Sequence, residues 1–151
     1  MLTSEDEEAW NNLISAFEFF LNKAYDSVVI PANVAVESKL NRVLFEVLRP
    51  AASNERIDSF LSDAATYGHQ LNVLLPLITR FIEMPSLPDH IRGILNRLRK
   101  CGNTVSHEGK LPIPTTVRHA AEYLCAAFFT FVYLKHFERK LFALTQNDKR
   151  G

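Results

Sequence analysis

Apolar residues recur every three or four positions along most of this chain, which is the spacing that buries one face of an α-helix. No stretch alternates apolar and polar residues as a strand does, and no internal repeat or low-complexity segment breaks the pattern. The pattern predicts helices over about 4–25, 28–48, 53–68 (ended by Gly68), 72–83, 87–107 and 116–143. The predicted fold class is therefore all-α, a single up-and-down-like bundle of five to six helices over residues 1–151, with a frayed tail from about 145.

Four of the predicted helices begin at recognisable capping residues. The helix at 53–68 has Ser53 or Asn54 in the capping position. Ser4 and Glu7 have the spacing of a capping box, in which each side chain binds a backbone N–H group of the first turn. Ser86 and Asp89 form a similar pattern before the helix at 87–107. Thr115 is placed to cap the last helix, because threonine accepts from the free N–H groups of a first turn.

The last predicted helix is apolar on more than one side. Its middle contains Phe128, Phe129, Phe131, Tyr133 and Leu134 in close succession. A helix that is apolar nearly all round lies either at the centre of a core or in a subunit interface. Both interpretations remain open from the sequence.

Composition excludes some classes of function without selecting one. The 151 residues contain 17 basic and 17 acidic side chains, so no global charge marks a nucleic-acid or membrane-surface binder. The N-terminus is acidic and lacks the apolar core of a signal peptide, and the apolar run at 120–134 is shorter than the roughly 20 residues that a bilayer requires. Cys101 and Cys125 fit buried free thiols in a reducing compartment. We expect a cytoplasmic protein with no membrane segment.

Local charge is concentrated on the helix at 87–107. Arg99, Asn103 and His107 lie four residues apart, so each step turns only about 40° around the axis and the three side chains form a ladder. Further polar and basic residues of the same helix are Arg92, Asn96, Arg97 and Lys100. One interpretation is a solvated helix face. The other is a phosphate-binding surface, because guanidinium groups grip phosphate oxygens and imidazole transfers protons near neutral pH.

Glu37 is a second candidate, located in the middle of the helix at 28–48 and close to its apolar face. A carboxylate in that position either points outward or needs a partner, because an unpaired buried charge is costly. The basic ladder is one possible partner, and the sequence leaves both options open.

The strong motifs of cofactor and metal chemistry are absent from the sequence. It contains no glycine-rich phosphate loop, no Cys-x-x-Cys and no His-Glu-x-x-His, and we predict neither a cofactor nor a metal site. His119 and Glu122 have helical spacing but no further ligands nearby, which is a weak metal signal. His69, His90 and His136 have no companions that suggest a site.

The residues that carry this chemistry also resemble a known family. The segment at 98–109 reads LRKCGNTVSHEG, and its pattern Arg-x-x-Gly-Asn-x-x-x-His, here Arg99, Gly102, Asn103 and His107, is similar to the signature of HEPN-superfamily domains. The resemblance is closest to small members of unassigned function, which also occur at the N-terminus of some type I restriction-enzyme motor subunits. It extends to the early helix with its central Glu37 and to YGHQL at 67–71, and it covers roughly 10–140.

The resemblance implies an all-α bundle that commonly forms a homodimer, with the arginine and histidine facing a cleft between the two chains. Many such domains are metal-independent endoribonucleases of toxin–antitoxin, phage-defence or RNA-processing systems. By that resemblance His107 is the general acid/base, Arg99 the phosphate clamp and Asn103 the orienting group, with Glu37 and Lys100 as secondary candidates. The expected nucleic-acid contacts are Arg92, Asn96 and Arg97.

A non-catalytic alternative is equally consistent with the resemblance, because other members serve as binding or dimerisation modules. Active members usually place the arginine and histidine closer together than the seven residues that separate Arg99 from His107 here. Lys100 shortens the gap by one residue but lacks the planar guanidinium fork. In the alternative, the ladder is a structural hydrogen-bond network, and the partner is an antitoxin or effector protein rather than RNA.

Overall fold

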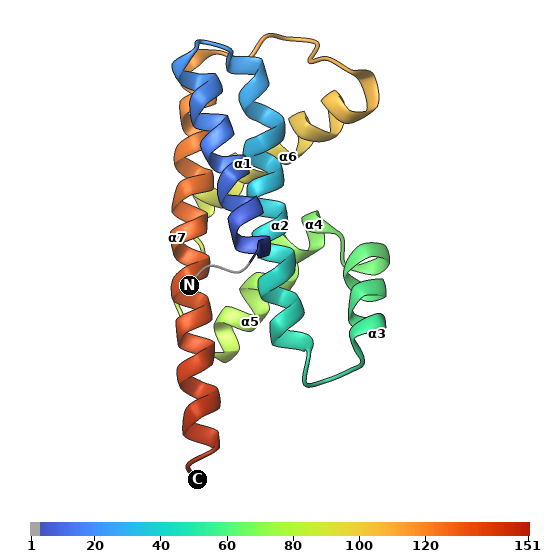
Figure 1. Ribbon diagram of the computed structural model, residues 1–151, viewed down its shortest axis with the longest axis vertical. Coiled ribbons are helices and arrows are strands. Elements are labelled where there is room, and N and C mark those ends of the chain that lie inside the picture. The colour runs from blue at the N-terminus through green and yellow to red at the C-terminus, as the bar shows by residue number, and fades with distance from the viewer. Residues whose placement is uncertain (1–3) are drawn as a thin grey trace.

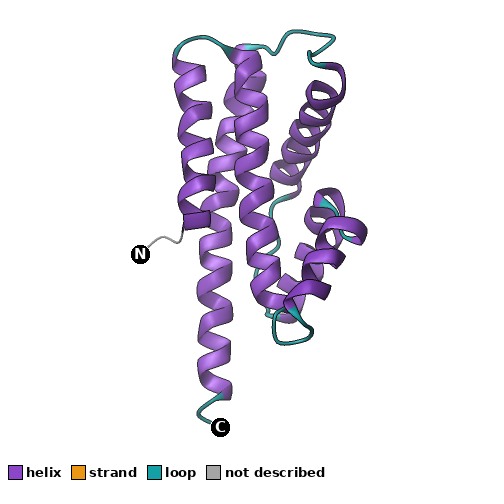
Figure 2. Ribbon diagram, turned by 45° about the vertical axis from the view of Figure 1, so that its right-hand side comes forward, coloured by secondary structure: helices purple, strands orange, loops and turns teal. Residues whose placement is uncertain are grey.

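The computed structural model describes residues 4–151, and every regular element in that range is a helix (Figures 1 and 2). The elements are α1 (Ser4–Leu21), η1 (Tyr25–Val28), α2 (Val29–Leu48), α3 (Asn54–Ser59), η2 (Phe60–Ala64), α4 (Tyr67–His69), η3 (Gln70–Leu74), α5 (Leu75–Phe81), α6 (Asp89–Glu108) and α7 (Val117–Asp148). Adjoining short elements form two longer segments, at 54–64 and 67–81. The all-α prediction is confirmed, with six main helical segments in the described part of the chain.

The long helices α1, α2 and α7 lie side by side and form the main layer of the bundle (Figure 1). The second layer consists of α6, which packs against α2 and α7, and of the segment at 54–81, which lies beside the C-terminal half of α2 (Figure 2). Short side chains allow helix axes to approach closely. The buried alanines of the main layer are Ala9, Ala16, Ala32, Ala35, Ala120, Ala126 and Ala127.

A buried ion cluster joins all three helices of the main layer. The Lys39 side chain of α2 is fully buried and its Nζ donates to Asp6 Oδ1 of α1 at 2.7 Å and to Glu138 Oε1 of α7. Arg42, one turn further along α2, also pairs with Asp6. These charges hold the pKa of Asp6 well below its ordinary value, although burial alone acts in the opposite direction. The spacing of apolar residues did not predict that Lys39 would be buried on the core face of α2.

Two helices end earlier than predicted, and left-handed residues end them. The first helix was expected to reach residue 25 but stops at Leu21, where Lys23 has a φ of 61° and Ala24 N–H donates to Phe19 O at 2.9 Å. The segment at 67–81 ends in the same way at Glu83, with a φ of 55°. Both helix ends are Schellman motifs without the usual glycine, so the sequence did not predict where these helices end.

The segment at 54–81 departs furthest from the prediction. Ser53 caps its first turn by accepting from Arg56 N–H at 3.4 Å, which agrees with the expected cap. Gly68 was expected to end this helix but lies inside α4, where its lack of a side chain makes room for a neighbour from α6. The following helix therefore begins at Tyr67 rather than at 72. Two π-helical stretches, η2 and η3, lie within this segment.

The starts of the last two helices also differ from the predicted caps. The N-cap of α6 is Pro88, and no side chain caps it, so the expected roles of Ser86 and Asp89 are wrong. The cap of α7 is Thr116, whose hydroxyl accepts from His119 N–H at 3.1 Å, one residue beyond the predicted Thr115. The capping box expected at Ser4 borders residues 1–3, which lie outside the described residues.

Helix α7 is longer than the apolar repeat predicted. It continues beyond 143 and is helical as far as Asp148, which includes part of the tail expected from about residue 145 (Figure 1). None of the helices within 4–151 offers an apolar stretch of the length that a membrane crossing needs.

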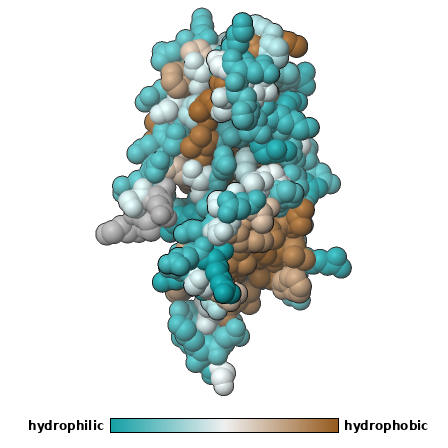
Figure 3. Space-filling model, turned by 90° about the vertical axis from the view of Figure 1, so that its right-hand side faces the viewer, coloured by the Kyte–Doolittle hydropathy of each residue, from teal (hydrophilic) through white to brown (hydrophobic). Residues whose placement is uncertain are grey.

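Two apolar surfaces remain open to solvent on the described chain. On α1 and α7 the partly exposed side chains are Trp10, Ile14, Phe17, Phe128 and Val132, each with 38–44% of its surface accessible. On η3 and α5 they are Val73, Leu77 and Phe81, and Phe81 is 80% exposed. The apolar area low on the molecule in Figure 3 lies at the height of α5. The repeat in the sequence identified these residues as apolar but not which of them the core covers.

Candidate functional site

Helix α6 contains the three residues of the predicted ladder, but their side chains lie in different surroundings. Arg99 is half-buried against the second layer, whereas Asn103 and His107 are exposed. The guanidinium of Arg99 points toward the N-terminal end of α6, where its Nη2 donates to Asn96 Oδ1 at 3.4 Å. The eight residue-to-residue steps from Arg99 to His107 rise about 12 Å along the helix. Within one chain these two groups therefore face different surroundings.

Arg99 is accommodated by a glycine of α4. A methyl group placed on Gly68 would lie 3.2 Å from Cζ of Arg99, so only glycine leaves the guanidinium its full room. Nε of Arg99 is buried and makes no hydrogen bond with any described residue. A guanidinium N–H that is withdrawn from water without a partner is energetically costly, and such groups are rare in folded proteins.

Two more buried groups lie in the same region without their hydrogen bonds. Asn33 of α2 packs against Gly102 of α6, and a methyl group on Gly102 would lie 3.1 Å from Asn33 Nδ2. Oδ1 of Asn33 and the hydroxyl of Tyr67 are both buried and accept or donate no hydrogen bond among the described residues. Burial raises the pKa of Tyr67 strongly, the negative charge of Glu37 adds to the rise, and Arg99 opposes it. Tyr67 is therefore a neutral phenol.

We refer to Asn33, Glu37, Tyr67 and Arg99 as the polar junction. Its members come from α2, α4 and α6, and two of them, Asn33 and Tyr67, were not candidates in the sequence analysis. The only sequence signal for Asn33 is its position four residues before Glu37, which places both on one side of α2. Tyr67 could have been suspected only from the resemblance at 67–71.

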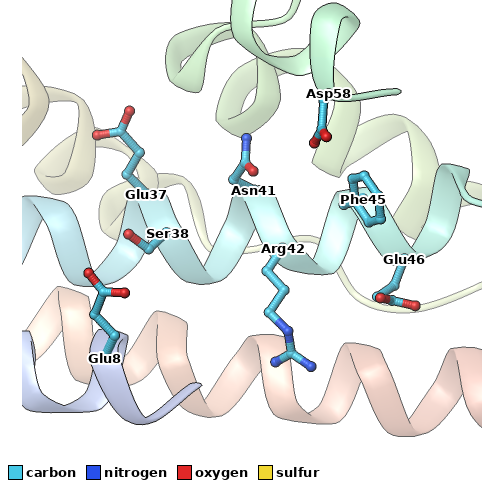
Figure 4. A pocket seen from close by; sticks show the side chains of 8 residues that line it. All are labelled: Glu8, Glu37, Ser38, Asn41, Arg42, Phe45, Glu46 and Asp58. Carbon is cyan, nitrogen blue, oxygen red and sulfur yellow. The ribbon is translucent and has the colours of Figure 1, made fainter. Parts of the chain in front are cut away.

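Glu37 makes no ion pair or hydrogen bond with a described residue, so the partner that the sequence left open is absent. Its pKa is raised because packing removes part of the carboxylate's hydration. Glu37 also borders a cavity of about 560 Å³ beside α2, which is shown in Figure 4. The cavity is lined by Glu8, Glu37, Ser38, Asn41, Arg42, Phe45, Glu46 and Asp58. Its carboxylates make this side of α2 unsuitable for a phosphate backbone.

The basic residues predicted to contact nucleic acid have partners within the chain. Arg92 pairs with Asp89 one turn away at 2.7 Å, which is an exposed contact of small energetic value. Arg97 pairs with Glu122 of α7, on the other side of α6. Lys100 is exposed, and its side chain makes no ion pair or hydrogen bond with a described residue.

Asn96 has a structural role that its sequence position did not reveal. It forms a reciprocal amide pair with Asn72 of η3, with N–O distances of 2.9 and 2.8 Å. Asn72 Nδ2 also donates to Gly68 O at 2.8 Å. These bonds connect α6 to the 67–81 segment and fix the surroundings of Arg99.

A row of accessible groups remains on the outer side of α6. Lys100, Asn103 and His107 are three and four residues apart, which keeps them within a sector of about 60°. All three are exposed, and their side chains make no hydrogen bond or ion pair with the described residues. We call this row the exposed stripe. It can offer an ammonium, an amide and an imidazole to the same ligand.

The weak metal signal at His119 and Glu122 has another explanation. The Glu122 carboxylate is engaged by Arg97 and by Arg118, whose Nε lies 3.1 Å from Oε1. Burial acts to raise the pKa of Glu122, but the contacts with Arg118 and Arg97 together lower it. Among the described residues, no group of three or more histidine, cysteine or acidic side chains is placed to hold a metal ion.

Comparison with known proteins returned no match to a family model, to a curated protein or to a solved structure.

Proposed function

We propose that the protein is a HEPN-like domain that binds RNA along the exposed stripe of α6. The observation that carries the proposal is the stripe itself, because Lys100, Asn103 and His107 are accessible and have no partner among the described residues. An ammonium group contacts phosphate, and amide and imidazole groups contact phosphate, sugar hydroxyls or base edges. The balanced charge of the whole chain limits this to a local electrostatic interaction.

Cleavage is the more demanding part of the proposal. His107 is exposed and carries an imidazole, the side chain most often used in general acid/base catalysis, which suits metal-independent attack by a ribose 2′-hydroxyl. Arg99 points away from it, toward Asn96, so one chain alone does not supply both groups to one phosphate. Cleavage by this pair would require a second chain docked at α6, a contact different from the α1–α7 face described next.

The same proposal includes a homodimer formed through α1 and α7. The rings of Trp10 and Phe131 form a T-shaped pair with their centroids 5.8 Å apart. The neighbouring Phe128 and Val132 extend this apolar face. Partly exposed aromatic side chains on two adjacent long helices are typical of a protein interface. A cytoplasmic role in a defence or stress system, such as toxin–antitoxin or phage defence, follows from the resemblance alone.

The second candidate is a non-catalytic module that docks a protein partner such as an antitoxin or effector. The partial burial of Arg99 and its bond to Asn96 favour it, because these contacts resemble a structural network. The exposed apolar residues of η3 and α5, above all Phe81, also favour a protein partner.

One experiment separates the two candidates. Binding of a labelled single-stranded RNA is measured by anisotropy against salt concentration, and cleavage of an RNA pool is followed in EDTA. We expect Lys100→Ala and His107→Ala to weaken binding, and Lys100→Ala to reduce the slope of log K against log salt by about one. The matched control is Lys140→Ala, an exposed lysine of α7.

Cleavage that survives EDTA and disappears in His107→Ala would make the protein a ribonuclease. RNA binding without cleavage would leave the binding function alone. No binding at micromolar protein, with the folded dimer intact, would overturn the proposal in favour of the protein-docking module.

A further inference from the structure

A second cavity lies on the opposite side of α6 from the polar junction. It has a volume of about 310 Å³, opens to solvent and is bordered by α6, α7 and the loop at 109–116. Arg99, Asn103 and His107 do not line it, although the secondary candidate Lys100 does. Ligand sites for small organic molecules begin at about 300 Å³, so the space fits a single small group rather than a length of chain.

The loop that closes this cavity is held in place at both ends. Gly109 ends α6 with a φ of 76°, a left-handed conformation that favours glycine. At the other end, the backbone N–H of Thr115 donates to Asp26 Oδ1 of η1 at 2.6 Å. Pro112 and Pro114 between them restrict the backbone further. The cavity is therefore formed before any ligand arrives.

The floor of the cavity is neutral and aromatic. Tyr123 of α7 is 2% exposed, and its hydroxyl lies 3.5 Å from Cys101 Sγ of α6. Burial and the contact with Cys101 raise the pKa of Tyr123 to about 12, so it carries no charge at physiological pH. The ring of His119 lies beside that of Tyr123, with centroids 6.3 Å apart and planes inclined by 31°. Leu111 and Ile113 add apolar surface from the loop.

The rim of the cavity is positive. Lys100 and Arg97 of α6 line it, and the guanidinium of Arg97 lies 5.6 Å from the centre of the Tyr123 ring. Glu122 is the neighbouring acid, but two guanidinium groups, from Arg97 and Arg118, already bind it. One carboxylate is thus set against three cations. Lys100 belongs both to this rim and to the exposed stripe, so the two surfaces are continuous.

We propose that this cavity binds one unpaired ribonucleotide, with the base between the loop and the floor and the phosphate on Lys100 and Arg97. An apolar, aromatic slot bordered by cations is how proteins hold single-stranded bases. The proposal rests on the proposed RNA binding and deepens it, because it makes single-stranded RNA the preferred form. In this arrangement the RNA backbone contacts the exposed stripe of α6, and one base leaves the strand and enters the neighbouring cavity.

The test fills the cavity without changing its charge. Thr104 lines the cavity from α6, and among the described residues its hydroxyl bonds only the backbone carbonyl of Lys100. Thr104→Phe therefore places a ring in the space. The matched control is Ser106→Phe, an exposed position of the same helix outside the cavity. The probes are a single-stranded oligoribonucleotide, an abasic strand of equal length, an RNA duplex and the individual ribonucleoside monophosphates. Thermal melts establish that both variants are folded.

We expect Thr104→Phe to weaken binding of the single strand by about 5- to 150-fold, the range that stacking of one base accounts for, and to abolish monophosphate binding. Ser106→Phe should leave binding of the single strand and of the monophosphates unchanged. The affinity of the wild-type protein for the abasic strand should equal the affinity of Thr104→Phe for the base-bearing single strand. Equal binding of abasic and base-bearing strands, unaffected by Thr104→Phe, would overturn this inference while leaving RNA binding intact. Monophosphate binding without RNA binding would support a nucleotide site in the cavity and overturn the proposed RNA-binding function. If neither monophosphates nor RNA bind, both proposals are overturned.

Discussion

Two polar clusters on α2 have opposite hydrogen-bonding states, so we expect them to affect the stability of the fold in opposite ways. In the first, Lys39 is completely buried and bound by Asp6 and Glu138. In the second, the polar junction, Arg99 and Tyr67 keep buried donors without partners among the described residues. A buried charge with its partners in place contributes to one fixed arrangement of helices, whereas an unpaired one raises the energy of the folded state.

The two acids next to these clusters report the same difference. Bonds from Lys39 and Arg42 outweigh burial at Asp6 and lower its pKa, while burial without a partner raises the pKa of Glu37. The Lys39 and Asp6 side chains of the first cluster are therefore paired with each other inside the fold. Unsatisfied groups of the second kind collect where a protein binds something or changes its contacts. The four predictions below test this contrast, in order of decreasing effect.

The largest effect is expected from Lys39→Ala. It leaves the buried Asp6 without one of its partners and removes a link between α1, α2 and α7, so we expect a loss of about 3–5 kcal/mol in the free energy of unfolding. Urea denaturation followed by circular dichroism measures it. Lys140→Ala, an exposed lysine of α7, is the control and should change stability by less than about 0.5 kcal/mol. A loss below about 1 kcal/mol for Lys39→Ala would contradict the assigned role.

The second prediction concerns acid stability. The pKa of Asp6 is lower in the folded than in the unfolded chain, so ionised Asp6 contributes stability above the ordinary carboxyl pKa of about 4, and this is lost as the pH falls below it. Asp6→Asn should cost about 2 kcal/mol at pH 7 and progressively less toward pH 2. Glu37→Gln should behave oppositely, with a small gain at pH 7 that vanishes in acid. Parallel pH profiles for wild type and Asp6→Asn would refute the assignment.

The third prediction compares two glycines of α6. Gly102→Ala forces a methyl group to within 3.1 Å of Asn33, and we expect a loss of about 1–3 kcal/mol. Gly93→Ala meets no atom within 4 Å and should stabilise the helix by about 1 kcal/mol, because alanine is the better helix former. Thermal melts of the two variants should therefore shift in opposite directions. A gain in both would mean that Asn33 yields easily and that the junction is loosely packed.

The smallest effect on stability is expected at His107. Its side chain is exposed without a described partner, so His107→Ala should change the free energy of unfolding by less than about 0.5 kcal/mol. RNA binding should weaken in the same sample, which separates function from folding. A destabilisation of 1 kcal/mol or more would instead assign His107 a structural role, in support of the docking module.

Much of the fold could be predicted from the sequence because helices are encoded locally. The spacing of apolar residues gave the class and most helix bounds, and Ser53 was recognised as a cap because the bond it makes is three residues away. The errors occurred where a local signal was missing or ambiguous. Lys23 and Glu83 end helices in a left-handed conformation that usually requires glycine. Gly68 was expected to end a helix, but its missing side chain leaves space for the Arg99 guanidinium.

The candidate site was predictable only in part, for a related reason. The sequence by itself determined that α6 would be helical and that Arg99, Asn103 and His107 would follow one another along it. Only the tertiary structure decided that the Arg99 side chain packs against Gly68 while that of His107 stays in solvent. It also decided that Lys39 meets partners 33 and 99 residues away. Helical periodicity fixes which side of a helix a residue is on, but what it meets there depends on how distant helices pack.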